Sequence, residues 1–167
     1  APEYPLSWQA RALTGLMRHT VKPVSHLFLR HALALNAASQ LGELVRLLPV
    51  GTPGHVTVVP AAFSACGGEW VRAGDDLDQR KAVLYLHGGG YFSGSPRTHR
   101  PITWRLSAVA RCPVLALEYR QGPVFKLADS LSDSLDAYIC LLDQGYEPED
   151  VIIAGDSAGG HLALATL

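Results

Sequence analysis

The stretch that decides the fold is Val151-Ile152-Ile153-Ala154-Gly155-Asp156-Ser157-Ala158-Gly159-Gly160. The apolar run before the first glycine predicts a short buried strand, and the apolar residues after the last one predict a helix. A strand that turns sharply into a helix lifts the side chain at the turn above the sheet edge. It also strains the backbone there, so the residues two before and two after the turn must be small. Gly155 and Gly159 meet this requirement. We therefore predict that Ser157 is the nucleophile of a strand–turn–helix elbow.

A second glycine-containing motif, His87-Gly88-Gly89-Gly90-Tyr91, follows the apolar run 82–86 directly. Successive glycines let backbone N–H groups point into a cleft with no Cβ in the way. Acyl transfer requires such donors, aimed at the oxyanion that develops on the substrate. A flexible glycine turn is the alternative interpretation. The order of the two motifs, with one β/α unit between them, is the order that the α/β-hydrolase architecture requires.

Two regions of different pattern precede and surround these motifs. Residues 6–48 have the apolar spacing of two helices, separated by Pro23. Strand-like runs at 55–59 and 69–73 follow, and Cys66-Gly67-Gly68 predicts the turn of an antiparallel pair between them. We assign residues 1–50 to an N-terminal helical cap segment and residues 51–167 to the first part of a catalytic domain.

The remainder of the catalytic region alternates between strands and helices. Continuous apolar runs at 82–86, 114–117 and 151–154 predict strands buried on both faces. We place the start of the first helix between them at Pro101. The second helix ends before Gly145, and one of its faces carries Leu127, Leu131, Leu135, Tyr138 and Leu142. The alternation predicts an α/β fold with a mainly parallel, doubly wound sheet and right-handed crossovers.

The amino-acid composition limits which binding partners and which cellular location we expect for the protein. Lysine and arginine (14) nearly balance aspartate and glutamate (15), so nothing calls for nucleic acid as a partner. Charged residues interrupt the most apolar stretch, 24–48, which argues against stable membrane insertion, and no targeting segment is visible. The three cysteines are widely spaced and predict no disulfide framework. We therefore expect a cytoplasmic protein.

Both motifs resemble the paired signatures of the hormone-sensitive-lipase-like esterases, which carry His-Gly-Gly-Gly and Gly-Asp-Ser-Ala-Gly. Glu118-Tyr119-Arg120 is similar to that family's Asp-Tyr-Arg, and the likeness runs from about residue 55 to 167. The resemblance implies an α/β-hydrolase with Ser157 as nucleophile. It also implies an oxyanion hole made by the N–H groups of Gly89, Gly90 and Ala158.

Three further residues are assigned to the substrate site. The resemblance implies a cap formed in part by the N-terminal helices, with Tyr91 near the wall of the acyl pocket. We add Gly88 and Asp156 as substrate-binding residues. Asp156 points away from where a base would stand, and a structural role is the alternative for it. The family usually continues Tyr-Arg with Leu-Ala-Pro-Glu-His-Pro, whereas this chain has Gln121-Gly122-Pro123-Val124-Phe125-Lys126. This departure bears on substrate preference more than on reaction class.

The catalytic base is the missing part. In this architecture the acid and the histidine follow the serine in the chain. The only histidine after Ser157 is His161, whose side chain leaves the helix one turn further on, where we expect packing or hydrogen bonding. We expect His55 and His99 at the surface. An elbow strand at the sheet edge would also expose apolar surface. We therefore expect a chain truncated after the elbow helix, or completed by a second chain or a homodimer partner, and inactive as this segment alone.

These residues predict a carboxylic-ester hydrolase that works through a serine acyl-enzyme on short-to-medium acyl or compact hydrophobic esters. No cofactor and no metal are implied. One alternative is a non-catalytic, receptor-like protein that binds a small ligand on the same scaffold, as the plant gibberellin receptors do. Another is an amide or peptide hydrolase.

Overall fold

A computed structural model describes residues 7–16, 18–19 and 51–167. The chain divides into two units, residues 1–38 and 39–167, which are described separately. In the first unit a helix, α1, runs from Trp8 to Leu16 and begins with the Ser7 hydroxyl accepting from the Ala10 N–H. The helix expected after Pro23 lies outside the described residues.

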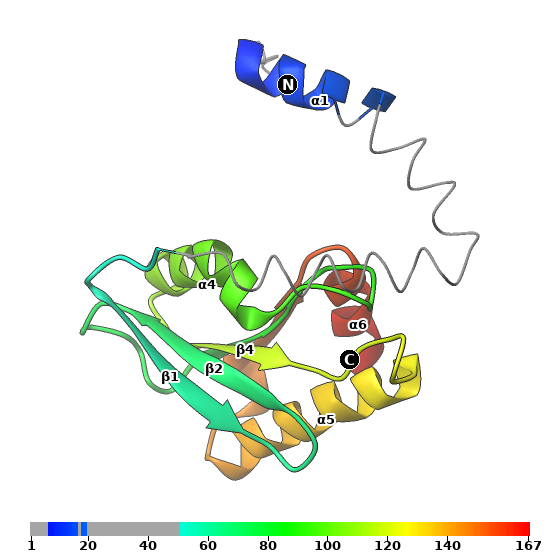
Figure 1. Cartoon of the computed structure of the whole chain (residues 1–167). Helices are drawn as coiled ribbons and strands as arrows, with labels where there is room; N and C mark the ends of the chain where they lie inside the picture. The colour runs from blue at the N-terminus through cyan, green and yellow to red at the C-terminus, as the bar shows by residue number, and fades with distance from the viewer. Residues whose placement is uncertain (1–6, 17, 20–50) are drawn as a thin grey trace. The chain divides into compact units, whose positions relative to one another are not determined.

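The second unit is built on a five-stranded sheet with the order β1-β2-β4-β3-β5 (Figure 1). Its strands are β1 (Val56–Ala62), β2 (Gly67–Ala73), β3 (Ala82–Leu86), β4 (Val114–Glu118) and β5 (Val151–Gly155). The first two pair antiparallel, β2 pairs antiparallel with β4, and β4, β3 and β5 are parallel to one another. The predicted antiparallel pair and mainly parallel region are thus confirmed. The hairpin turn lies before Gly67, because both predicted turn glycines belong to β2.

Helices cover both faces of the sheet (Figure 1). They are α4 (Pro96–Ala110), α5 (Leu127–Asp143) and α6 (Ala158–Thr166), and a short 3₁₀ turn, η2 (Pro148–Asp150), precedes β5. One core cluster joins Val83 and Tyr85 of the sheet to Trp104 of α4. The other joins Leu84 and Leu86 to α5 and α6. Adjacent residues of β3 therefore face opposite layers, and the strand is buried throughout, as its continuous apolar run predicts.

Helix α4 starts five residues earlier than the sequence predicted. The hydroxyl of Ser95 accepts from the Thr98 N–H, the Thr98 hydroxyl accepts from the Ser95 N–H, and Pro96 occupies the first turn. This capping box satisfies N–H groups at the start of the helix, so Pro101 lies inside it and does not begin it. The difference matters because it moves His99 from a connection onto the first turns of a packed helix.

The buried face of α5 also differs from the prediction. Leu127 and Leu135 are exposed, and the buried residues are mostly small or polar: Ser130, Asp133, Ser134, Ala137 and Leu141. Their polar groups are satisfied by distant parts of the chain. Asp133 accepts from the Arg120 guanidinium, and the Ser134 hydroxyl hydrogen-bonds that of Thr166 on α6. Because this buried face consists largely of small and polar residues, the sequence shows no hydrophobic periodicity that would predict it.

Strand β5 pairs with β3 on one side, and among the described residues no strand pairs with its other side. Ile152, in the middle of β5, keeps 59% of its surface exposed. An apolar strand edge of this kind is a template for pairing with further backbone.

An ion pair between α4 and β2 yields a stability prediction. Arg100 donates to both carboxylate oxygens of Glu69, at 2.8 and 2.6 Å, and Glu69 is only 7% exposed. Arg100→Leu should lower the free energy of unfolding by about 3 kcal/mol, because it leaves a buried carboxylate without its partner. The double variant Arg100→Leu/Glu69→Leu should recover most of the loss. Denaturant titration checks both, and equal losses in the single and double variants would contradict the expectation.

Candidate active site

Ser157 lies at the turn between β5 and α6, as predicted. Its backbone has φ 51° and ψ −118°, a combination that L-residues other than glycine rarely adopt. Its side chain is exposed, and its hydroxyl makes no hydrogen bond among the described residues. The strained turn therefore presents a free hydroxyl at the N-terminus of a helix, where the helix dipole favours negative charge.

Close backbone packing explains the glycines beside the serine. A Cβ at Gly159 would collide with the carbonyl oxygens of Leu86 and His87. A Cβ at Gly155 would meet the backbone of Gly159 and lie 2.6 Å from the Leu86 carbonyl oxygen. The elbow thus rests directly on the end of β3, where the His87–Tyr91 segment begins. Small residues at these positions bring Ser157 and the glycine loop together.

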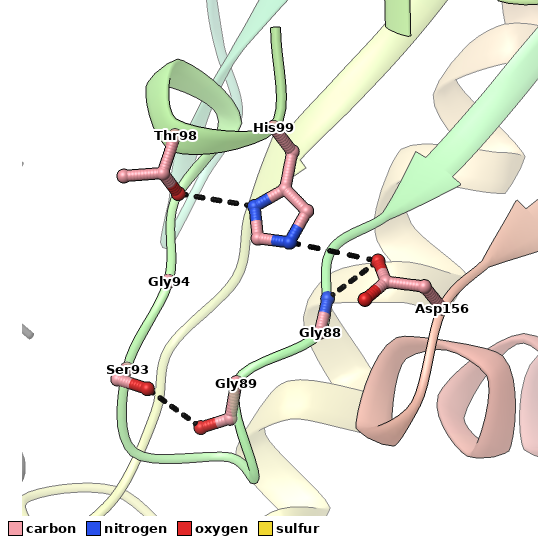
Figure 2. Close-up of a pocket in the computed structure, with 7 residues that line it drawn as sticks. All are labelled: Gly88, Gly89, Ser93, Gly94, Thr98, His99 and Asp156. Atoms are coloured by element: carbon pink, nitrogen blue, oxygen red, sulfur yellow. Dashed lines mark hydrogen bonds and ion pairs between the residues drawn. The ribbon is translucent and has the colours of Figure 1, made fainter. Parts of the chain in front are cut away.

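Each carbonyl group at the start of this loop is held. The His87 carbonyl accepts from the Tyr119 hydroxyl at 2.6 Å. The Gly88 carbonyl lies 2.8 Å from Nδ1 of His87, which must be the donor because a carbonyl only accepts. The Gly89 carbonyl accepts from both the hydroxyl and the N–H of Ser93 (Figure 2).

These bonds fix where the next N–H groups point. In a planar trans peptide the C=O and the following N–H point in opposite directions. Because the carbonyls of Gly88 and Gly89 are held by His87 and Ser93, the N–H groups of Gly89 and Gly90 point away from these two residues. Neither of these N–H groups, nor that of Ala158 at the start of α6, has a hydrogen-bond acceptor among the described residues. Fixed, unoccupied donors beside a free hydroxyl are what an oxyanion hole requires.

Tyr91 links the end of the glycine loop to α6. Its hydroxyl lies 2.7 Å from Nδ1 of His161, and its ring meets that of Tyr119 edge-on. Its carbonyl accepts from the N–H of Gly122, at 2.7 Å. The 121–126 segment, which departs from the family's pattern, therefore attaches directly to Tyr91. Val124 and Phe125 of that segment are exposed. The place of Tyr91 at the wall of an acyl pocket stays a prediction.

Asp156 and Gly88 contact each other. The Asp156 carboxylate accepts from the Gly88 N–H at 2.9 Å and from the Tyr85 hydroxyl at 2.7 Å. Burial disfavours its charged form, but these hydrogen bonds and the nearby His99 outweigh burial, and the pKa of Asp156 lies below its ordinary value. Both residues line a cavity of about 280 Å³ (Figure 2). Oδ1 of Asp156 and the N–H of Gly88 are engaged in these contacts, which fit the structural alternative for Asp156, and binding of substrate by either residue stays a prediction.

The four histidines of residues 51–167 are engaged elsewhere than at the Ser157 hydroxyl. His55 packs edge-on against Trp104, and His87 holds the Gly88 carbonyl. His161 bonds Tyr91, the hydrogen-bonding role expected for it. His99 is not at the surface as predicted: its side chain is 17% exposed and faces Asp156. Among residues 51–167, no imidazole hydrogen-bonds the Ser157 hydroxyl.

Comparison with known proteins agrees with this geometry. The family described as the alpha/beta hydrolase fold matches residues 83–167, the span from β3 through the elbow. A crystal structure titled as an esterase of the bacterial hormone-sensitive lipase family is 30% identical and superposes on 80% of this chain with a TM-score of 0.67. The chain belongs to the hormone-sensitive-lipase-like α/β-hydrolases.

Other proteins similar to this chain are named as an acetyl-hydrolase and an esterase. An acetyl-hydrolase of Streptomyces hygroscopicus is 43% identical over 115 residues, which make up 69% of this chain and 36% of that protein. The esterase EstE5, in crystals soaked with p-nitrophenyl butyrate, is 36% identical with a TM-score of 0.72, over 77% of this chain and 44% of that one. The chain thus spans less than half the length of these two relatives. No helix of its described residues has the length and apolarity to cross a membrane.

Proposed function

We propose that this chain carries the nucleophile and the oxyanion hole of a carboxylic-ester hydrolase. The observation that carries the proposal is the strained turn of Ser157 beside the fixed, unoccupied N–H groups of Gly89, Gly90 and Ala158. Donors fixed before the reaction need no reorganisation when charge develops, and removing one such donor from a hydrolase typically slows it by about 10²–10³-fold.

The mechanism follows from this arrangement. The Ser157 oxygen attacks the ester carbonyl carbon, and its proton passes to a general base. The carbonyl oxygen becomes an oxyanion that accepts from the three N–H groups. Collapse of the tetrahedral intermediate expels the alcohol, which takes the proton from the base, and water then hydrolyses the acyl-enzyme. The histidines of residues 51–167 are otherwise engaged, so the base and its acid partner come from outside these residues. We therefore propose that residues 51–167 alone are inactive.

Short-to-medium acyl esters, or compact hydrophobic esters, are the proposed substrates. One relative is named an acetyl-hydrolase, and EstE5 crystals were soaked with a butyrate ester. Tyr91 and the exposed Val124 and Phe125 supply apolar surface next to the glycine loop. We propose Tyr91 as part of the acyl-pocket wall.

Covalent labelling tests the reaction class. The protein at its natural length, treated with a fluorophosphonate, should gain one adduct on Ser157, detected by peptide mass spectrometry. It should hydrolyse p-nitrophenyl acetate and butyrate much faster than the matching anilides, since an anilide has the poorer leaving group. An unlabelled Ser157 would instead favour a small-ligand-binding protein, and comparable rates on anilides would favour an amide hydrolase.

Compartment and assembly belong to the same proposal. The cysteines Cys66, Cys112 and Cys140 are free thiols, which supports a cytoplasmic location. The unpaired side of β5 supports pairing with another chain, either a second copy or a different one. Cell fractionation tests the first point, and light scattering of the purified protein tests the second.

A further inference from the structure

Three parts of the fold converge on the carboxylate of Asp156. The Tyr85 hydroxyl comes from β3, the Gly88 N–H from the loop that follows it, and Nε2 of His99 from the first turns of α4. All three face the same oxygen, Oδ1, and Nε2 lies 3.6 Å from it. Figure 2 shows the side chain of Asp156 directed at Gly88 and His99 across the loop. The residue before the nucleophile therefore contacts the segment that carries the oxyanion donors.

The hydrogen bond from Gly88 to Asp156 fixes the N–H side of the peptide between His87 and Gly88. Among the described residues, no other group accepts from this N–H. The peptide joining His87 to Gly88 is anchored at its carbonyl by Tyr119 and at its N–H by Asp156. The next residues, Gly89 and Gly90, have φ values of 129° and 66° and no side chains with which to fix themselves. The hydrogen bonds to the Gly88 and Gly89 carbonyls orient the N–H groups of Gly89 and Gly90, and the peptide plane before them sets where that segment begins relative to the elbow. A loop loosened at Gly88 would misplace two donors at once.

We propose that Asp156 and His99 are positioning residues that hold the Gly88–Gly90 loop in register with Ser157, an inference that rests on the proposed ester hydrolysis. Asp156 joins the elbow to the loop, and His99 joins both to α4. Neither residue touches substrate. Their effect is on the distance between the nucleophile and the oxyanion donors.

The groups around His99 show how it would position Asp156. Its Nδ1 lies 3.0 Å from both the Ser95 carbonyl oxygen and the Thr98 hydroxyl, so two groups of the first turn of α4 orient the ring and direct Nε2 at Asp156. With a proton on Nε2, the ring donates to Asp156 across the 3.6 Å between them. The capping box of α4 fixes the turn that presents this ring.

Two substitutions of Asp156 separate its geometry from its charge. Asp156→Ala removes the acceptor, and kcat on p-nitrophenyl butyrate should fall about 10²-fold with KM within about twofold, as for the loss of one oxyanion donor. Asp156→Asn keeps an oxygen for Gly88 but loses the charge, and it should lie between Asp156→Ala and the wild type. An Asp156→Ala protein with unchanged kcat would overturn the proposal.

Two substitutions of His99 form a matched pair. Asn carries its amide near the place of Nδ1, and Gln carries its amide near the place of Nε2. His99→Asn should lower kcat about tenfold through a small displacement of the loop, and His99→Gln should recover most of that loss. If His99→Gln is as slow as His99→Asn, the contact with Asp156 is not what His99 provides, and its place in the pair is refuted.

Hydrogen exchange of the Gly88 amide, measured by NMR on the natural-length protein, needs no activity. It should be protected in the wild type and exchange at least about tenfold faster in Asp156→Ala, because its acceptor is gone. Equal exchange rates would refute the geometric basis of the proposal. If the wild type neither hydrolyses esters nor reacts with a fluorophosphonate, ester hydrolysis fails, and this measurement still decides whether Asp156 holds the loop.

Discussion

Ser157→Ala should abolish fluorophosphonate labelling and lower ester hydrolysis by about 10⁴-fold or more, because no acyl-enzyme can form without the hydroxyl. The residual rate would come from the oxyanion donors and from substrate binding, which the substitution leaves in place. Label incorporation and the steady-state hydrolysis of p-nitrophenyl butyrate by the natural-length protein measure the two effects.

The same substitution should leave the fold unchanged. The Ser157 hydroxyl has no hydrogen-bond partner among the described residues, and alanine accepts the left-handed turn about as readily as serine does. Unfolding midpoints of the two proteins should therefore agree. Hydrolysis that survives Ser157→Ala would show that another nucleophile acts, and it would remove the elbow from the proposed mechanism.

Gly159→Ala should have the largest effect on structure. The added Cβ would strike the backbone carbonyls of Leu86 and His87, where no side chain can rotate away. We expect a loss of about 3 kcal/mol or more in the free energy of unfolding, together with slow labelling of Ser157, because relief of the clash pushes the elbow off β3. Denaturant titration and the labelling rate measure these losses.

Gly160→Ala is the matched control in the next position of the same helix. Its Cβ would lie 3.3 Å from the nearest atom, the carbonyl oxygen of Gly155, so a small shift accommodates it. The better helix propensity of alanine, about 1 kcal/mol, offsets that shift, and stability should stay near the wild-type value. Equal losses in both variants would mean that α6 simply rejects side chains there and that close packing on β3 is not the cause.

Several elements could be predicted because a single local signal defines them. The runs at 82–86, 114–117 and 151–154 each became a strand whose bounds match to within one residue. Burial on both faces was predicted correctly for β3 and almost all of β4, because such strands need continuous apolar sequence, but β5 is only partly buried and Ile152 is exposed. The elbow and the glycine loop were found in the same way, because strained backbone and close approach restrict the residue types allowed.

Features that depend on distant partners could not be predicted. The buried face of α5 is set by Asp133 and Ser134, whose partners, Arg120 and Thr166, lie on other elements. The burial of His99 could not be predicted because Pro101 is itself a typical first residue of a helix, which puts His99 outside α4. The capping pair Ser95 and Thr98 was the signal that would have placed it on a helix.

The proposed oxyanion donors are main-chain N–H groups, and the carbonyls whose hydrogen bonds orient two of them are main-chain groups as well. A point substitution that merely exchanges one side chain for another cannot delete such a donor, whereas Tyr91 and the 121–126 segment are free to vary in shape and polarity. In the proposed site, the backbone thus supplies the chemistry and the side chains supply the substrate preference, so the two can evolve separately. A lineage with this architecture can change the esters it accepts by altering side chains, while its capacity to stabilise negative charge passes on with the backbone.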